Sequence, residues 1–144
     1  MRIRPLVQTD WEDWRALWAG YLDFYRTALP DETSSDTFER LCGADDAMFG
    51  LLAVDDTEGG IGLANCVVHA QTWSPQPTCY LEDLFVAPAA RGSDTGRALL
   101  LAAKEAARTR GADRLYWHTQ QYNGRARSLY DQVGRLTSFV VYEM

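Results

Sequence analysis

Two adjacent acidic residues on a predicted strand, followed by a glycine-containing loop, have the types and spacing that indicate chemistry. The predicted strand over residues 78–86 is rich in β-branched and aromatic residues and carries Glu82 and Asp83. The loop over residues 91–96 reads Arg-Gly-Ser-Asp-Thr-Gly and opens an Ala- and Leu-rich helix predicted over residues 96–110. Backbone amides and the dipole at such a helix start favour a phosphate. The pattern predicts a phosphorylated cofactor beside two carboxylates.

A second segment makes this prediction more specific. Asn123, Ala126, Leu129 and Tyr130 follow the pattern N-x-x-A-x-x-L-Y on a helix predicted over residues 123–133. Together with the strand ending in Val-Ala-Pro and the Arg-Gly loop, this segment resembles the GNAT superfamily of acetyl-CoA-dependent N-acetyltransferases. The run Tyr-Leu-Glu-Asp-Leu-Phe-Val is similar to the polyamine and thialysine acetyltransferase branch. The resemblance implies direct transfer of acetyl from acetyl-CoA to a primary amine of a small molecule, polyamine-like or amino-acid-like.

The resemblance also implies roles for individual residues. An alkylamine with a pKa of about 10 is protonated at neutral pH, so the reaction needs a base that removes this proton. Glu82 matches the position of that base, which acts through a water, and Tyr130 matches the acid that protonates the departing thiolate. The resemblance implies that the strand end over residues 84–86 holds the oxyanion through its backbone amides. The positions that match the family's cofactor-binding residues are Leu84, Phe85, Val86, Arg91, Gly92, Ser93, Thr95, Gly96, Arg97 and Asn123.

The residues themselves leave several alternatives open. In a regular strand Glu82 and Asp83 point to opposite faces, and a bulge would change that, so Asp83 is also a candidate substrate contact. The plain alternative is an exposed acidic pair on a strand edge, and Tyr130 taken alone is a core aromatic. Asp94 stands where the family has a glycine. Its carboxylate either repels the cofactor phosphates or turns to solvent on a left-handed backbone.

The elements that must position these residues form a mixed pattern. Strands are predicted over residues 3–7, 47–54, 61–71, 78–86, 114–119 and 139–142. The first helix is predicted to begin at Thr9 and to end before Pro30, and a loop is predicted over residues 31–35. Further helices are predicted over residues 36–42, 96–110 and 123–133. This βααβββαβαβ order predicts an α/β (α+β mixed) fold, a mostly antiparallel sheet flanked by helices, in a single domain over residues 1–144.

One stripe of the first predicted helix is aromatic. Trp11, Trp14, Trp18, Tyr21 and Tyr25 recur at three- and four-residue steps. The tryptophans are predicted to pack on the sheet, whereas Tyr21 and Tyr25 carry hydroxyls that need partners and are predicted to line the substrate pocket.

Composition limits the partners. With 14 Lys and Arg against 20 Asp and Glu, the net charge of −6 argues against nucleic-acid binding and favours small cations such as amines. No apolar run is long enough to cross a membrane, and no signal peptide is recognised, so we expect a cytoplasmic protein. Three cysteines without a CxxC pair predict reduced thiols. Cys66 and His69 lack a second pair of ligands, so no metal is predicted.

Two further function classes stay open at this point. Asp94 is compatible with a non-catalytic module that binds acyl-CoA or a protein partner, and a protein amine is an alternative acceptor. The resemblance implies a homodimer. The exposed part of the tryptophan stripe is the predicted interface patch.

Overall fold

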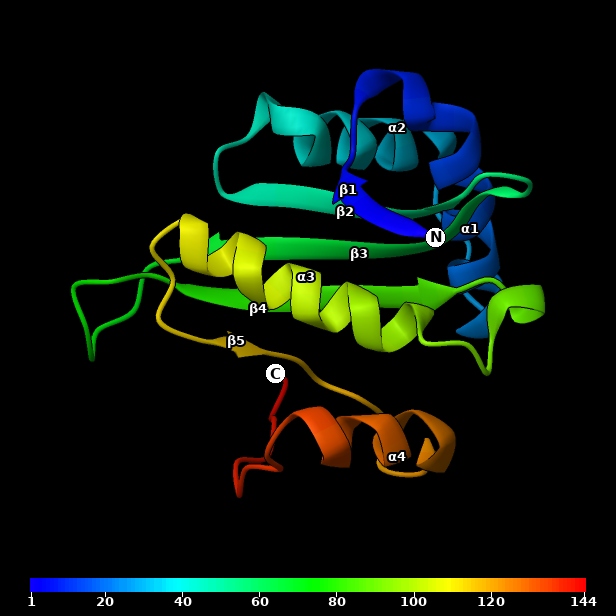
Figure 1. Cartoon of the computed structure of the whole chain (residues 1–144). Helices are drawn as coiled ribbons and strands as arrows, with labels where there is room; N and C mark the ends of the chain where they lie inside the picture. Colours follow the sequence, from blue (N-terminus) through cyan, green and yellow to red (C-terminus); the bar gives the residue numbers. More distant parts are fainter.

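The computed structural model describes all residues from Met1 to Met144 and contains one five-stranded sheet in the order β1-β2-β3-β4-β5 (Figure 1). The first four strands pair antiparallel with their neighbours, and the last pair, β4 with β5, is parallel. The strands are β1 (Arg2–Pro5), β2 (Met48–Asp55), β3 (Gly59–His69), β4 (Thr78–Val86) and β5 (Leu115–Tyr116).

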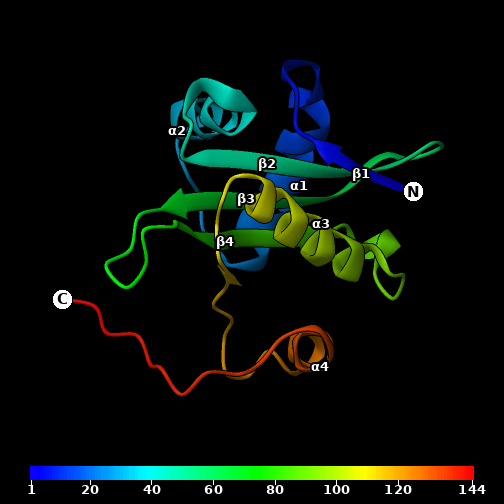
Figure 2. The same cartoon turned by 60° about the vertical axis from the view of Figure 1, so that its left-hand side comes forward.

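Four helices flank the sheet on both faces. They are α1 (Trp11–Phe24), α2 (Asp31–Glu39), α3 (Thr95–Thr109) and α4 (Gly124–Val133). Helices α1 and α2 lie on one face, α3 crosses the other, and α4 lies beside β5 (Figures 1 and 2). The predicted architecture, a mixed and mostly antiparallel sheet flanked by helices, is confirmed.

Each face of the sheet has its own buried core. Beneath α3, buried Leu99, Leu100 and Ala103 pack on small and branched residues of the strands, because the Ala- and Leu-rich helix turns one apolar stripe to the sheet. On the other face Trp14 and Trp18 of α1 pack with residues of α2 and the strands. The tryptophan prediction is confirmed for these two, which are 0% and 7% exposed, and Trp11 packs against the same core while staying partly exposed.

The boundaries of the first two helices differ from the prediction. Helix α1 ends at Phe24, before Pro30, because Arg26 adopts a left-handed backbone with φ of 53°. Residues 31–35, predicted as a loop, form the first half of α2. Pro30 directly precedes that helix, and Asp31 and Glu32 in its first turn favour the helix dipole. The polar residues 31–35 are typical of a loop, but the signals for a helix start at Pro30, Asp31 and Glu32 decide the structure.

The prediction of a final strand over residues 139–142 is wrong. These residues are extended but pair with no strand, and β5 is only two residues long where residues 114–119 were predicted. Composition favoured strands at both places, but a strand forms only where a partner edge is within reach. No helix of the structure is long and apolar enough to cross a membrane.

Candidate active site

A β-bulge in β4 places the two adjacent carboxylates. Asn65 of β3 lies opposite Asp83 and Cys66 lies opposite Leu81, so Glu82 is the extra residue on β4. The bulge reverses the alternation of the strand. In a regular strand Leu81 and Phe85 would face the same side, because they are an even number of residues apart. Here Leu81 packs in the core beneath α3, whereas Phe85 packs in the core on the α1 side. This settles the orientation that alternation alone had left open.

Beyond the bulge, β4 separates from β5 and opens a cavity of about 400 Å³. The β4–β5 pairing stops at Tyr80 and Tyr116, so from Leu81 onward β4 is paired only with β3. The cavity lies between this strand end, the start of α3 and α4. The predicted site residues that line it are Tyr21, Tyr25, Glu82, Leu84, Phe85, Val86, Arg91, Gly92, Ser93, Gly96, Arg97, Asn123 and Tyr130.

The loop before α3 has the shape that a phosphate site requires. Gly92 has φ of 84°, which favours glycine, and the loop leads into the first turn of α3. At Gly96 a Cβ atom would lie 3.3 Å from Leu129 Cδ2 of α4, so the missing side chain keeps the two helices close there. Arg91, Arg97 and Arg125 all line the cavity, although the whole chain is acidic. These residues fit a phosphorylated cofactor.

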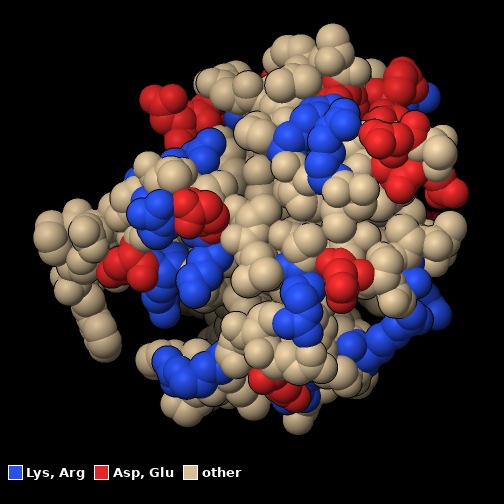
Figure 3. All heavy atoms as spheres, viewed as in Figure 1, with Lys and Arg blue, Asp and Glu red and all other residues tan.

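Basic side chains also gather on this side of the surface. On the face shown in Figure 3, Lys and Arg predominate over α3 and α4, whereas Asp and Glu gather around the β2–β3 hairpin. Charge is therefore unevenly distributed over a chain whose net charge is −6. A local basic field beside the loop favours an anionic cofactor.

Glu82 and Asp83 lie in different environments. The carboxylate of Asp83 accepts a hydrogen bond from Asn65 Nδ2 at 3.0 Å, and Trp14 Nε1 donates to Asn65 Oδ1 at 3.3 Å. Burial raises the pKa of Asp83 above its ordinary value, and the neighbouring Tyr21 hydroxyl and Asn65 amide oppose this shift. Asp83 does not line the cavity. It belongs instead to a polar chain that ties β4 to β3 and α1.

Glu82 lines the cavity, and its pKa is shifted toward that of a base. Partial burial raises this pKa first, the neighbouring Asp83 carboxylate raises it further, and Arg40 opposes the shift. A carboxylate with a raised pKa is a better proton acceptor when ionised.

Tyr130 lies on the opposite wall, contributed by α4. Its ring packs against Trp117 with the ring centroids 5.3 Å apart, and burial raises the pKa of its hydroxyl. The hydroxyl therefore keeps its proton at neutral pH. Asn123 caps this helix through a hydrogen bond of 3.4 Å from Ala126 N to its Oδ1.

The aromatic stripe of α1 runs from the core to the cavity. Ring centroids of Trp14 and Trp18 are 5.3 Å apart, those of Trp18 and Tyr21 are 5.2 Å apart, and those of Tyr21 and Tyr25 are 4.9 Å apart. Burial raises the pKa of both tyrosine hydroxyls. The rigid tryptophan stack thus positions two tyrosines on the cavity wall.

One further predicted position and one detail of the loop differ from expectation. Thr95 is 2% exposed, and its hydroxyl lies 2.8 Å from that of Ser93 rather than on the cavity wall. Asp94 is exposed and lines the cavity, but its φ of −78° is not left-handed. Gly92 takes the left-handed position instead.

Several residues of the cavity wall were not among the predicted site residues. Trp117, His118 and Thr119 line it directly after β5, and so do Phe24, Leu81, Arg125, Ala126 and Leu129 from other elements. Their place after the end of a parallel strand, where ligands bind in α/β sheets, is the signal that points to the first three. His69 is exposed at the end of β3, and its Nε2 lies 2.7 Å from the Tyr116 hydroxyl oxygen.

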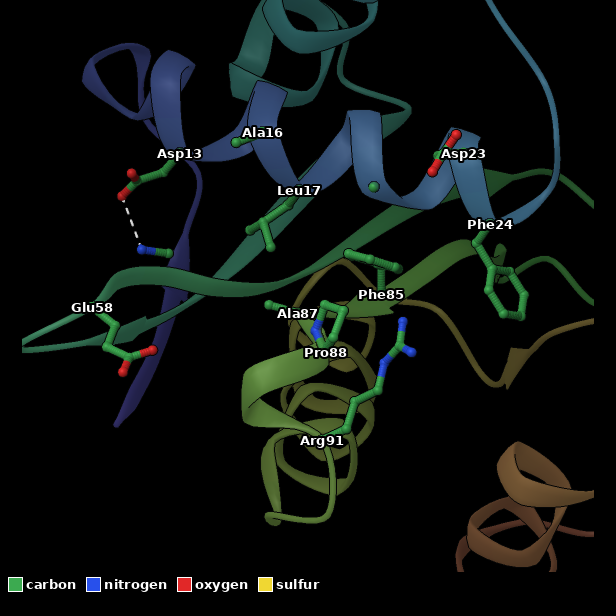
Figure 4. Close-up of a pocket in the computed structure, with 12 residues that line it drawn as sticks. Asp13, Ala16, Leu17, Asp23, Phe24, Glu58, Phe85, Ala87, Pro88 and Arg91 are labelled. Carbon is green, nitrogen blue, oxygen red and sulfur yellow. Dashed lines mark hydrogen bonds between the residues drawn. The ribbon is translucent and has the colours of Figure 1, made fainter.

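A second hollow of about 560 Å³ lies on the other side of Phe85 (Figure 4). Asp13, Asp23 and Glu58 lie around it, and Asp13 Oδ2 accepts a hydrogen bond of 3.0 Å from Gly60 N. Glu82 and Tyr130 do not line this hollow. The carboxylate with the raised pKa and the phosphate loop therefore meet only in the first cavity.

Comparison with known proteins agrees with this geometry. Residues 11–134 match the sequence model of the acetyltransferase (GNAT) family. The chain is 33% identical over 142 residues to the D-amino-acid N-acetyltransferase HPA3 of Saccharomyces cerevisiae, covering 98% of this chain and 88% of the yeast protein. It is 34% identical over 144 residues to the uncharacterized N-acetyltransferase YhfO of Bacillus subtilis, covering 99% and 95%.

Solved structures share the fold. The aminoglycoside N-acetyltransferase AAC(6')-Iy in complex with CoA superposes with a TM-score of 0.86 at 22% identity, over 99% of this chain and 93% of that one. A probable acetyltransferase superposes with a TM-score of 0.87 at 25% identity, over 100% and 97%. The chain belongs to the GNAT family of acetyl-CoA-dependent N-acetyltransferases.

Proposed function

We propose that this protein acetylates the primary amine of a small molecule by direct transfer, with Glu82 as the base and Tyr130 as the acid. The observation that carries the proposal is the bulge at Glu82, which turns a carboxylate into the cavity where β4 leaves β5, opposite Tyr130. Acetyl-CoA supplies the activated acetyl thioester. The chain must hold it, remove a proton from the amine and return a proton to the thiolate.

The loop before α3 is the proposed place for the cofactor phosphates. The amides at the start of α3 and the guanidinium groups of Arg91, Arg97 and Arg125 supply donors and positive charge on the cavity wall. The open edge of β4 over Leu84–Val86 leaves backbone amides without a partner strand on the β5 side. These amides are the proposed donors for the oxyanion.

Glu82 is the proposed base and acts through a water. The acceptor binds as an ammonium and must lose a proton before its nitrogen attacks. The raised pKa of Glu82 makes its ionised carboxylate a stronger acceptor for that proton. The rate is therefore expected to rise with pH as Glu82 ionises.

Tyr130 is the proposed acid. Burial keeps its hydroxyl protonated, so it is able to donate to the sulfur of the leaving thiolate. No cysteine lines the cavity, and Cys66 and Cys79 are 0% exposed. This supports direct transfer without an acyl-enzyme.

The acceptor half of the cavity favours a cationic small molecule. Phe24, Tyr21 and Tyr25 offer aromatic rings near the Glu82 carboxylate, a combination that attracts an ammonium group. Similarity to the D-amino-acid N-acetyltransferase HPA3 supports an amino-acid-like acceptor, and the Tyr-Leu-Glu-Asp-Leu-Phe-Val run supports a polyamine-like one. We also infer a homodimer.

A panel of amines tests this proposal. Thiol release from acetyl-CoA is measured with a polyamine, a D-amino acid, an L-amino acid and a lysine-containing peptide. We expect turnover with at least one small amine and none with the peptide. Turnover of the peptide alone contradicts the proposed acceptor class.

The base assignment needs a matched pair of variants. Glu82→Gln is expected to lower turnover by about 10² to 10⁴ and to remove the rise of the rate with pH. Glu32→Gln removes the same charge from the first turn of α2, outside the cavity, and is expected to leave the rate unchanged. Equal activity of the two variants contradicts the role of Glu82.

A further inference from the structure

Arg40 carries a guanidinium group that the protein uses only in part. It directly follows α2, and Figure 1 shows the chain turning from this helix into the start of β2. Its Nε donates to Asp36 Oδ2 at 2.9 Å, and its Nη1 donates to Met48 Sδ at 3.3 Å. Sulfur is a weak acceptor, Nη2 donates to no protein atom, and the side chain is 41% exposed. Arg40 therefore has donors left for a ligand.

The sheet register places Arg40 and Glu82 on the same face. Met48 of β2 lies opposite Val67 of β3, and Val67 lies opposite Tyr80 of β4. Opposite residues share a face, and adjacent strands are about 4.8 Å apart, so Met48 and Tyr80 lie about 10 Å apart on one face. Burial and then the charge of Glu82 raise the pKa of the Tyr80 hydroxyl, so Glu82 lies close to this row. Burial raises the pKa of Glu82, and the charge of Arg40 acts across the face to lower it.

The surface between these two charges is apolar and only half-buried. Val67 and Tyr80 are both half-buried, and the Tyr80 ring stacks on Tyr116 of β5 with the ring centroids 5.0 Å apart. A molecule that lies on this surface meets the Glu82 carboxylate on one side and the Arg40 guanidinium on the other. The face is therefore complementary to a small molecule that carries both a positive and a negative charge.

We propose that Arg40 binds the carboxylate of the acceptor, which is an amino acid whose ammonium group faces Glu82. A guanidinium presents two parallel N–H donors that match the two oxygens of a carboxylate. A polyamine carries a second ammonium group in place of the carboxylate, and Arg40 would repel it. Arg40 is thus the residue that selects between the two acceptor classes. The inference rests on the proposed function and narrows its substrate class.

Two acceptors that differ only in the carboxylate test this assignment. Phenylalanine, as each enantiomer, is compared with phenethylamine, and kcat/KM is measured by thiol release from acetyl-CoA. We expect the wild type to prefer one enantiomer of phenylalanine by about 10- to 100-fold, because phenethylamine leaves the guanidinium without its partner. Arg40→Gln is expected to remove this preference, mainly by raising KM for the amino acid. Arg40→Lys should keep part of it, because the charge stays but the paired donors are lost.

Two control variants separate carboxylate binding from other roles of Arg40. Asp36→Asn removes the ion pair with Arg40 but keeps the guanidinium, so the preference for phenylalanine should stay. Arg114→Gln removes another arginine from the same face, where its guanidinium lies 4.7 Å from the centroid of the Tyr116 ring, and should also leave the preference in place. Both acceptors need the same base, so the ratio of their kcat/KM values is independent of the effect of Arg40 on Glu82. A loss as large in Asp36→Asn as in Arg40→Gln, or a loss confined to Arg114→Gln, overturns the assignment.

Binding measured without chemistry separates this inference from the proposed function. Free CoA cannot supply an acetyl group, so calorimetric titration of the protein–CoA complex with the same acceptors measures recognition alone. Tighter binding of phenylalanine than of phenethylamine, lost in Arg40→Gln, supports the carboxylate site even if neither compound is acetylated. A wild type without preference, or the same preference in wild type and Arg40→Gln, overturns it. Turnover of both acceptors would then still support the proposed function.

Discussion

The two halves of β4 have opposite tasks, although they are continuous in sequence. Thr78, Cys79 and Leu81 before the bulge are at most 2% exposed, and pairing with strands on both sides reaches Tyr80. After the bulge the strand is paired on one side only, and Glu82, Leu84 and Val86 line the cavity. The first half stabilises the sheet. The second half is not paired with β5, and this leaves its backbone groups and the Glu82 carboxylate free to face a ligand.

Substitutions on the two sides of this boundary should separate stability from activity. Leu81→Ala removes a side chain that is 2% exposed in the core beneath α3 and is expected to cost about 2 to 5 kcal/mol of unfolding free energy. Glu82→Gln, one residue further on, is expected to change stability by less than about 0.5 kcal/mol. Urea unfolding of both variants measures the difference. Similar losses would mean that the bulge does not divide the strand.

Tyr130 extends the comparison to the opposite wall of the cavity. Tyr130→Phe keeps the packing against Trp117 and removes only the hydroxyl. We expect turnover to fall by about 10² with little change in cofactor affinity, because a general acid acts in the transition state. Steady-state kinetics and calorimetric titration with acetyl-CoA check this. A loss of affinity with unchanged turnover would instead assign Tyr130 to binding.

Asp83 connects the two halves through electrostatics. Its charge raises the pKa of Glu82, so Asp83→Asn is expected to move the acid limb of the rate profile to lower pH. Asp31→Asn, at the start of α2, is the control and should leave the limb in place. An unmoved limb in Asp83→Asn would show that Asp83 does not influence the base.

The same substitution affects stability in a direction that the raised pKa fixes. The folded state binds the Asp83 proton more tightly than the unfolded state, so unfolding free energy falls as pH rises from the unfolded pKa through the folded one. Above both values the full penalty remains. Asp83→Asn removes this fall, and thermal unfolding between pH 3 and 7, about the range in which carboxylates titrate, measures it. The same pH dependence of stability in the wild type and in Asp83→Asn contradicts the shift.

The sequence predicted the regular part of this molecule better than its exceptions. Helix α3 and strand β4 follow from local patterns, and β4 begins and ends where expected. The bulge at Glu82 was not predictable, because it is a property of the β3–β4 register and leaves the strand composition unchanged. The missing strand over residues 139–142 has a similar cause, since a strand needs an edge and the sequence does not say which edge is free.

Asp94 predicts a smaller effect at the other end of the cavity. It is exposed and makes no capping hydrogen bond, so its main effect on the cofactor is charge. At a separation of about 6 Å, repulsion of one phosphate charge costs about 0.7 to 3 kcal/mol for an effective dielectric between about 80 and 20, and exposure favours the lower end. Asp94→Gly is therefore expected to tighten acetyl-CoA binding about three- to tenfold in calorimetric titration. Asp94→Asn keeps the side-chain size and should reproduce most of the gain, and added salt should shrink the difference from wild type. Equal affinity of all three proteins would mean that the carboxylate does not sense the phosphates, and a gain confined to glycine would assign the effect to the loop backbone.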